Sequence, residues 1–147
     1  MLVIVDYKAG NLKSVERACS EVGVEAEISG DPEKIRQASR LIFPGVGAAG
    51  AAMASLQETG IDEAIREFFN LGRPVLGICL GLQITLNYSE ENQTKTLGLI
   101  AGEVKKFRLK ETGLKIPHMG WNTVNVLQQH PVLDRIEPRD EFYFVHS

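Results

Sequence analysis

The feature that most constrains the fold of this chain is an alternation of short, largely apolar runs with segments of helical periodicity. Four runs predict strands, at Leu2–Val5, Val24–Ile28, Leu41–Phe43 and Arg73–Ile78. Between the first two, apolar residues from 11 to 22 recur at intervals of three and four, the period of an amphipathic helix. Apolar strands that alternate with helices are typical of a mainly parallel sheet. The sequence therefore predicts an α/β fold, whose ligands bind beyond the carboxyl ends of the strands.

The pattern changes in the second half of the chain. A stretch rich in small residues from 45 to 56 leads into a predicted helix over 61–69, and residues 89–93 read as a polar loop. Short strands are predicted at 103–109 and 121–127, and residues 141–147 form an apolar, strand-like run. Because no segment has the composition of a linker, we expect one domain over residues 1–147 with extra short strands in its second half.

Composition and charge exclude several classes of protein. The 147 residues carry 16 Lys and Arg against 19 Asp and Glu, a net charge of -3, and no window is basic enough to follow a phosphate backbone. No segment reaches the roughly 20 apolar residues of a membrane span, and residues 1–5 lack the basic front of a secretory signal. We therefore expect a cytoplasmic protein that binds neither nucleic acid nor membranes.

The two cysteines need separate explanations. Cys19 and Cys79 lie far apart in the sequence, which disfavours a disulfide scaffold and excludes a four-cysteine zinc site. Cys19 falls on the apolar face of the helix predicted over 11–22, so we expect it to be a thiol of the core. We expect no metal site and no cofactor. Cys79 remains as the candidate for chemistry.

Cys79 lies in Gly77-Ile78-Cys79-Leu80-Gly81, where a predicted strand meets the start of a predicted helix. The spacing is that of the G-x-S-x-G nucleophile elbow, with sulfur in place of the hydroxyl oxygen. Glycines on both sides let the strand and the helix approach without a clash of Cβ atoms, and backbone N–H groups at the helix start can point at a developing oxyanion. A buried cysteine between two packing glycines is the alternative.

Two neighbouring features favour a catalytic interpretation. The turn Pro44-Gly45-Val46-Gly47 follows the third predicted strand and so lies at the same sheet edge as Cys79. Its glycines can bring backbone N–H groups close to a substrate carbonyl, although a simple tight turn is the alternative. Gln83 follows Cys79 by one helical turn and would project on the same side. Gln83 is either a substrate contact or an ordinary surface glutamine, and both interpretations remain open.

Taken together, these segments resemble the class I glutamine amidotransferases. Residues 77–83 and 44–47 are typical of that whole family. Three further motifs are similar to the glutaminase subunits of imidazole glycerol phosphate synthase: Asp6-Tyr7 with Gly10-Asn11-Leu12, Pro117-His118-Met119-Gly120-Trp121-Asn122, and Phe142-Tyr143-Phe144-Val145-His146-Ser147. The resemblance covers the whole chain. It implies a flavodoxin-like class I glutamine amidotransferase domain with a mainly parallel central sheet flanked by helices.

The resemblance also implies a reaction. Cys79 would attack the side-chain amide of glutamine, release ammonia and leave a glutamyl thioester that water hydrolyses to glutamate. The backbone N–H groups of Gly47 and Leu80 would hold the oxyanion. The residues implied to hold the glutamine are Gly45, Gln83, His146 and Ser147.

By the same resemblance, a partner receives the ammonia. This partner is a (β/α)8-barrel cyclase subunit in a heterodimer, which makes imidazole glycerol phosphate and aminoimidazole carboxamide ribotide (AICAR) in histidine biosynthesis. The residues at partner-facing positions are Asn11, Met119, Trp121 and Asn122. The chain departs from the family at two places. Lys8 replaces a glycine near the expected partner face, and Ala49 replaces an aromatic residue beside the oxyanion turn.

None of the three histidines is a convincing base for Cys79. His130 is followed by proline, as in the family's His-Pro-x-Glu stretch, but Leu133 stands where the orienting Glu belongs, so a turn is predicted there. His118 lies in the partner-facing motif, and His146 matches a position that lines the pocket. Because the family runs to about 200 residues and the chain stops at Ser147, we expect the C-terminal part of the domain, with the catalytic His and Glu, to be missing. The 147-residue chain is then expected to be inactive alone.

Two other classes of protein stay open. A cysteine elbow also occurs in proteases and stress proteins of the same superfamily, but these lack the motif at 117–122 and the glutamine-contacting Gln83. A non-catalytic α/β binding module, with an inert Cys79, is the third reading.

Overall fold

The computed structural model describes residues 1–109, 113 and 115–147. The chain forms two compact units, residues 1–105 and residues 106–147, which are described separately. Among the described residues, no helix has the length and apolar character needed to cross a bilayer. In the same part of the chain, no group of three or more His, Cys, Asp or Glu side chains is placed to hold a metal ion.

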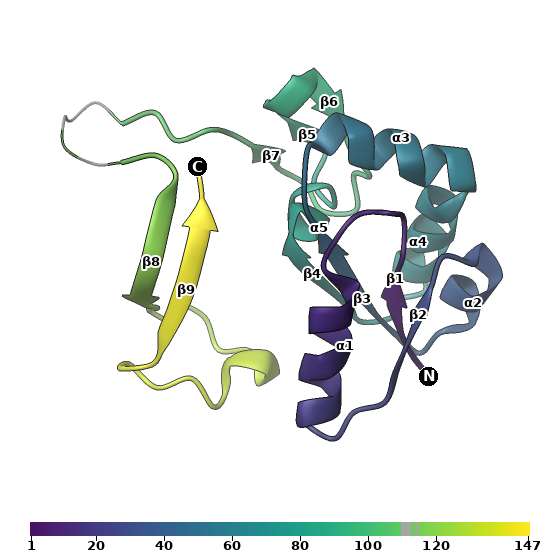
Figure 1. Ribbon diagram of the computed structural model, residues 1–147, viewed down its shortest axis with the longest axis horizontal. Coiled ribbons are helices and arrows are strands. Elements are labelled where there is room, and N and C mark those ends of the chain that lie inside the picture. Colours follow the sequence, from purple (N-terminus) through teal and green to yellow (C-terminus); the bar gives the residue numbers. More distant parts are fainter. Residues whose placement is uncertain (110–112, 114) are drawn as a thin grey trace. The chain divides into compact units, whose positions relative to one another are not determined.

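The first unit is built on a four-stranded parallel sheet (Figure 1). Its strands are β1 (Leu2–Val5), β2 (Ala26–Ser29), β3 (Arg40–Gly45) and β4 (Val75–Cys79), in the order β2-β1-β3-β4. This is the flavodoxin-like order, in which the chain reverses direction across the sheet between β1 and β3. The predicted α/β fold with a mainly parallel sheet is confirmed. The carboxyl ends of β1, β3 and β4 meet at one edge, where a ligand is expected.

Five helices accompany this sheet in the described residues: α1 (Leu12–Glu21), α2 (Pro32–Gln37), α3 (Ala49–Thr59), α4 (Ile61–Asn70) and the single turn α5 (Leu80–Gln83). The helix predicted over 11–22 is confirmed to within one residue at each end. The helix predicted over 61–69 is confirmed as α4, and the small-residue stretch before it, for which no helix was predicted, contains α3. Gly60 separates α3 from α4, because its left-handed φ of 70° ends one helix and starts the next.

Side chains at the helix starts explain where the first helices begin. Asn11 accepts a hydrogen bond from the Ser14 N–H at 3.3 Å and so caps α1. Asp31 accepts one from the Glu33 N–H at 2.9 Å and caps α2, whose first residue is proline. Each cap satisfies an N–H group that has no partner inside its helix.

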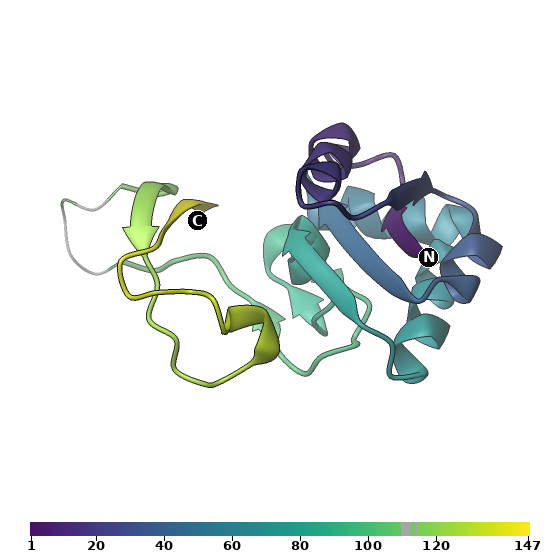
Figure 2. The same ribbon diagram turned by 90° about the horizontal axis from the view of Figure 1, so that it is seen from below.

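Helices lie on both faces of the sheet (Figure 2), and a separate apolar cluster packs on each face. On one face, Ile4 and Ile42 pack with Cys19 of α1, and Cys19 is only 8% exposed. The prediction that Cys19 is a core thiol is therefore confirmed. On the other face, Phe43 of β3 and Phe68 of α4 belong to a larger cluster that includes α2, α3 and α4. Burial of both faces explains why β1 and residues 41–45 of β3 are continuously apolar.

Short strands follow in the first unit, as the sequence predicts. A small sheet has the order β6-β5-β7, from β5 (Tyr88–Ser89), β6 (Thr94–Lys95) and β7 (Glu103–Val104). The loop predicted at 89–93 contains a 3-10 helix, η1 (Glu91–Gln93). The strand predicted over 103–109 was too long, because its pairing with the two-residue strand β5 covers only Glu103 and Val104.

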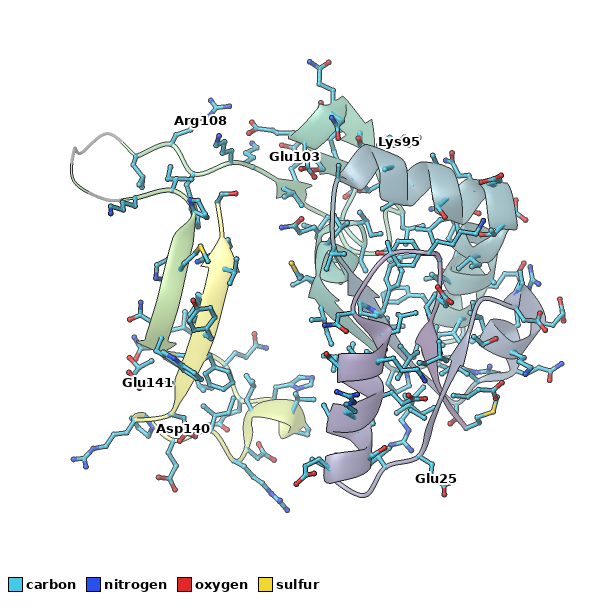
Figure 3. All side chains as sticks on the ribbon, in the orientation of Figure 1. Glu25, Lys95, Glu103, Arg108, Asp140 and Glu141 are labelled. Atoms are coloured by element: carbon cyan, nitrogen blue, oxygen red, sulfur yellow. The ribbon has the colours of Figure 1, made fainter. Side chains whose placement is uncertain are left out.

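The second unit contains an antiparallel pair, β8 (His118–Thr123) and β9 (Glu141–His146), and a 3-10 helix, η2 (Pro131–Leu133). The strand predicted over 121–127 is real but lies three residues earlier at its start. Pairing sets its bounds, since His118 is opposite His146 and Thr123 is opposite Glu141, the first residue of β9. Side chains stand on both faces of this pair, and Glu141 is labelled at the start of β9 in Figure 3.

Candidate active site

Cys79 stands at a sharp turn between β4 and α5. It has φ 54° and ψ -121°, a conformation that L-residues rarely adopt. The thiol-bearing residue is exposed, unlike Cys19. The structure therefore shows the strand-to-helix turn that the glycine spacing predicts, with a cysteine at its strained position.

The two glycines of the elbow are required by close approach of the backbone. A Cβ on Gly77 would lie 2.7 Å from the Leu82 Cα, well inside any real contact. A Cβ on Gly81 would overlap the carbonyl oxygen of Phe43. Both glycines let α5 lie directly on the ends of β3 and β4, which holds the Cys79 turn in place.

Gly45 lies opposite Cys79 in the pairing of β3 with β4. A Cβ on Gly45 would overlap the Tyr7 hydroxyl and lie 2.7 Å from the Gly81 nitrogen. The structure thus brings Gly45, the elbow and the end of β1 to one point. Gly47 differs, because no heavy atom lies within 4 Å of its Cβ position and its φ is 92°. A glycine is favoured at 47 by backbone conformation rather than by space.

The remaining candidates from the elbow lie within α5. Leu80 is its first residue and is 2% exposed, so its side chain anchors the turn in the core. Gln83 is its last residue and is half-buried. Since Gln83 follows Cys79 by about one turn, the two lie along the same side of the short helix.

Tyr7 is a residue of this site that the sequence reasoning used only as a family motif. It follows β1, is 1% exposed, and its ring packs against Phe43 at 5.4 Å between centroids. Burial, and then the charge of Cys79, raises the pKa of Tyr7 to about 12. Its hydroxyl has no hydrogen-bond partner among the described residues. A tyrosine after an apolar strand looks like any other core aromatic, so no local sequence signal marks this hydroxyl.

Glu91 is a second residue that sequence reasoning missed. Its Oε2 accepts a hydrogen bond of 2.9 Å from the N–H of Ala49, at the start of α3 and just beyond the Gly45–Gly47 turn. Ala48, at the N-cap position, has no side-chain oxygen to do this. That missing cap is the sequence signal that could have pointed to a carboxylate from elsewhere in the chain.

In the second unit, three of the motif residues form a hydrogen-bonded chain. His118 Nδ1 lies 2.8 Å from His146 Nε2, across the β8/β9 pair. The Asn122 Nδ2 lies 3.1 Å from His118 Nε2, so the amide donates to that ring nitrogen. His118 then carries its proton on Nδ1 and donates to His146. The candidate pocket residue His146 is thereby joined to the motif expected to face a partner.

Register divides the partner-facing candidates between the two faces of the β8/β9 pair. Met119 and Trp121 point to one face together with Tyr143 and Val145, since side chains alternate along a strand and opposed residues share a face. All four are exposed, and the Trp121 and Tyr143 rings meet edge to face at 5.5 Å. Asn122 points to the other face, with the two histidines.

The three histidines of the chain all belong to the second unit, because residues 1–105 contain none. His130 Nδ1 accepts a hydrogen bond from the Val132 N–H at 3.2 Å and caps η2. The turn predicted at His130 is confirmed. Ser147 follows β9 and is exposed.

Comparisons with known proteins agree with one another. The model of the family "Glutamine amidotransferase class-I" matches residues 3–147. The chain is 53% identical over 154 residues to "Imidazole glycerol phosphate synthase subunit HisH" of Nitratidesulfovibrio vulgaris, covering all of this chain and 71% of that protein. It is 49% identical over 152 residues to the HisH subunit of Desulfovibrio desulfuricans, covering all of this chain and 70% of that protein.

A solved structure is similar in fold. The "Crystal structure of glutamine amidotransferase" has a TM-score of 0.67 to this chain at 18% sequence identity, and it aligns with 83% of this chain and 62% of that one. At this identity the similarity bears on the fold alone. It covers the parallel sheet with flanking helices on which the Cys79 turn is built.

Proposed function

This chain belongs to the class I glutamine amidotransferase family, in the group of HisH subunits of imidazole glycerol phosphate synthase, and we propose that it is the glutaminase subunit of such an enzyme. The observation that carries the proposal is the strained turn at Cys79, held between Gly77 and Gly81 and placed opposite Gly45. This is the geometry in which a thiol is presented to an acyl carbon.

The proposed reaction is hydrolysis of the glutamine side-chain amide. The Cys79 sulfur attacks the amide carbon, and the carbonyl oxygen becomes an oxyanion held by the N–H groups of Leu80 and Gly47. The C–N bond then breaks, and ammonia leaves with a proton from the base. Water attacks the resulting thioester, which releases glutamate and returns the thiol. Gly45, Gln83, His146 and Ser147 are the proposed glutamine contacts.

The reaction needs a base that accepts the proton of the Cys79 thiol. Residues 1–105 contain no histidine that could serve as this base. We therefore propose, as the family resemblance implies, that the base is none of the three histidines in these 147 residues. His130 is not a candidate, because its Nδ1 accepts the N–H of Val132 at the start of η2. His146 is assigned to the pocket, and its Nε2 lies 2.8 Å from His118 Nδ1.

We propose that the partner is a (β/α)8-barrel cyclase subunit in a cytoplasmic heterodimer. It would use the ammonia to make imidazole glycerol phosphate and AICAR in histidine biosynthesis. The exposed face that carries Met119 and Trp121 supports an interface there, since exposed aromatic and methionine side chains are enriched in protein interfaces. Asn11 and Asn122 are the further proposed contacts.

Labelling with a glutamine-analogue electrophile tests the proposal. Diazo-oxo-norleucine, applied in the presence of the cyclase partner, should add to Cys79 and not to Cys19, and glutamine should protect Cys79 from it. Mass spectrometry of the tryptic peptides locates the adduct. Cys79→Ala is the control and should take up no label.

The same experiment distinguishes the other two classes of protein. A protease or stress protein with this elbow would react with peptide-like or oxidising reagents without glutamine protection. A binding module with an inert Cys79 would not react selectively at all. Either result, obtained with the partner present, would contradict the glutaminase assignment.

A further inference from the structure

The hydroxyl of Tyr7 is a buried polar group that packing alone does not explain. Its oxygen is fully enclosed and has no hydrogen-bond partner among the described residues. A buried hydroxyl without a partner destabilises the folded state, whereas phenylalanine would fill nearly the same space without that penalty. The ring of Tyr7 already makes the apolar contacts, against Phe43. The oxygen atom therefore calls for an explanation of its own.

The position of the hydroxyl points to the Cys79 turn. The Tyr7 oxygen occupies the space beside the Gly45 Cα into which a side chain would project. A Cβ built on Gly45 would also lie 2.7 Å from the Gly81 nitrogen and 3.0 Å from the Leu80 Cβ, so these two atoms border the same space. Gly45 is paired with Cys79 across β3 and β4. The hydroxyl thus lies directly behind the turn that carries the nucleophile.

The backbone fixes Tyr7 in this place. Its carbonyl oxygen accepts a hydrogen bond of 2.7 Å from the Ser55 hydroxyl on α3. The ring is held on β3 by Phe43. Since both ends of the residue are tied to different elements, the hydroxyl cannot swing away to find another partner in the core.

We propose that Tyr7 is a positioning residue for the nucleophile, whose buried hydroxyl supplies a dipole behind the turn at which negative charge develops on Cys79. This inference rests on the proposed role of Cys79. It adds a residue from the end of β1 to a site that the sequence assigned to β3, β4 and α5.

Electrostatic coupling between the two groups supports the proposal. The charge of Cys79 contributes to the raised pKa of Tyr7, after the larger effect of burial. Because both effects raise its pKa, Tyr7 keeps its proton, and so its O–H dipole, while Cys79 carries charge. Tyr7 thus remains a donor throughout the pH range in which free thiols ionise.

The first test is alkylation of Cys79 by iodoacetamide, which needs no glutamine, base or partner. Tyr7→Phe keeps the ring and removes only the oxygen. We expect it to slow alkylation of Cys79 near neutral pH by a factor of about three to ten, and to move the pH–rate profile toward higher pH by about half a unit to one unit. Tyr88→Phe, which removes a hydroxyl from β5 in the same unit, is the matched control and should leave the profile unchanged.

A spectroscopic measurement gives a second and independent test. In protein labelled with ¹³C at the tyrosine Cζ, the Tyr7 resonance should shift between about pH 6 and pH 10, where free thiols lose their protons. The shift should be absent in Cys79→Ser. The other two tyrosine signals are assigned from Tyr88→Phe and Tyr143→Phe, so this test works even where Tyr7→Phe does not fold.

Two results would overturn the proposal. One is a Tyr7→Phe profile that overlays the wild-type profile while the variant is folded. The other is a Tyr7 resonance that does not respond to the ionisation of Cys79. Neither result bears on the glutaminase assignment, which is decided separately by glutamine-protected labelling of Cys79.

Discussion

Gly81 packs so closely on Phe43 that a Cβ on Gly81 would overlap the Phe43 carbonyl oxygen. The contact joins the start of α5 to the strand beside it, and it fixes the height of the Cys79 turn above the sheet. The backbone of β3 is held by pairing with β1 and β4 and so cannot move aside. The geometry of the Cys79 turn therefore depends on the absence of a side chain at Gly81.

We expect Gly81→Ala to lower the free energy of unfolding by about 1–3 kcal/mol or more, because the new methyl group meets backbone rather than a flexible side chain. Urea denaturation measures this loss. Gly50→Ala is the control. Gly50 lies inside α3, its Cβ would find ordinary contacts of 3.4 Å, and alanine should stabilise the helix by up to about 1 kcal/mol. Equal effects of the two substitutions would contradict the close contact at Gly81.

Lys8 has a φ of 64°, in the left-handed region that disfavours residues with a Cβ. The family's usual glycine at this place therefore has a conformational reason. Lys8→Gly should raise the free energy of unfolding by up to about 1 kcal/mol. Lys8→Ala removes the same charge but keeps the Cβ, so it should give no such gain. If both variants were more stable than the wild type, the loss of the Lys8 charge would explain the gain in stability instead.

Glu91 should stabilise the start of α3 from 42 positions away in the sequence. Glu91→Ala is expected to cost about 1–2 kcal/mol in the free energy of unfolding, since it leaves the Ala49 N–H without its acceptor. Glu91→Gln keeps an acceptor oxygen and should lose less. Thermal or urea unfolding of both variants checks the order, and a larger loss in the glutamine variant would speak against capping.

Asn11 combines an observed cap with a proposed interface, and two substitutions separate them. Asn11→Ala should cost about 1 kcal/mol in stability through loss of the α1 cap. Asn11→Ser keeps a capping oxygen and should cost little. If Asn11 also contacts the cyclase, both variants should bind it more weakly in calorimetric titration. If Asn11→Ala binds the cyclase more weakly but Asn11→Ser does not, Asn11 is not part of the proposed interface.

Tyr7 should make the protein sensitive to alkali. Its pKa of about 12 lies above the value of 10.0 for a free tyrosine, so the unfolded chain loses this proton first. The contribution of the Tyr7 proton to the free energy of unfolding is complete below about pH 10 and is lost as the pH rises toward 12. Tyr7→Phe should therefore be at least as stable as the wild type at neutral pH, and its advantage should grow above about pH 10. Urea unfolding across this range measures the difference, and parallel curves would refute it.

Much of the fold could be predicted because it depends on local pattern. Runs buried on both faces stay apolar, which placed β1 correctly and β3 nearly so. The helix period over 11–22 placed α1. The two-residue strand β7 and the bounds of β8 were misjudged, because those bounds depend on the length and register of a distant partner strand.

The sequence by itself determined the family, the sheet of alternating strands and helices, and the Cys79 turn, since each is encoded in residues that lie next to one another. Only the tertiary structure decided what surrounds that turn. Gly45 opposite Cys79, the Tyr7 hydroxyl behind them, and the Glu91 carboxylate on α3 all join residues far apart in the chain. Such contacts follow from strand register and close packing, and neither is written in any local pattern.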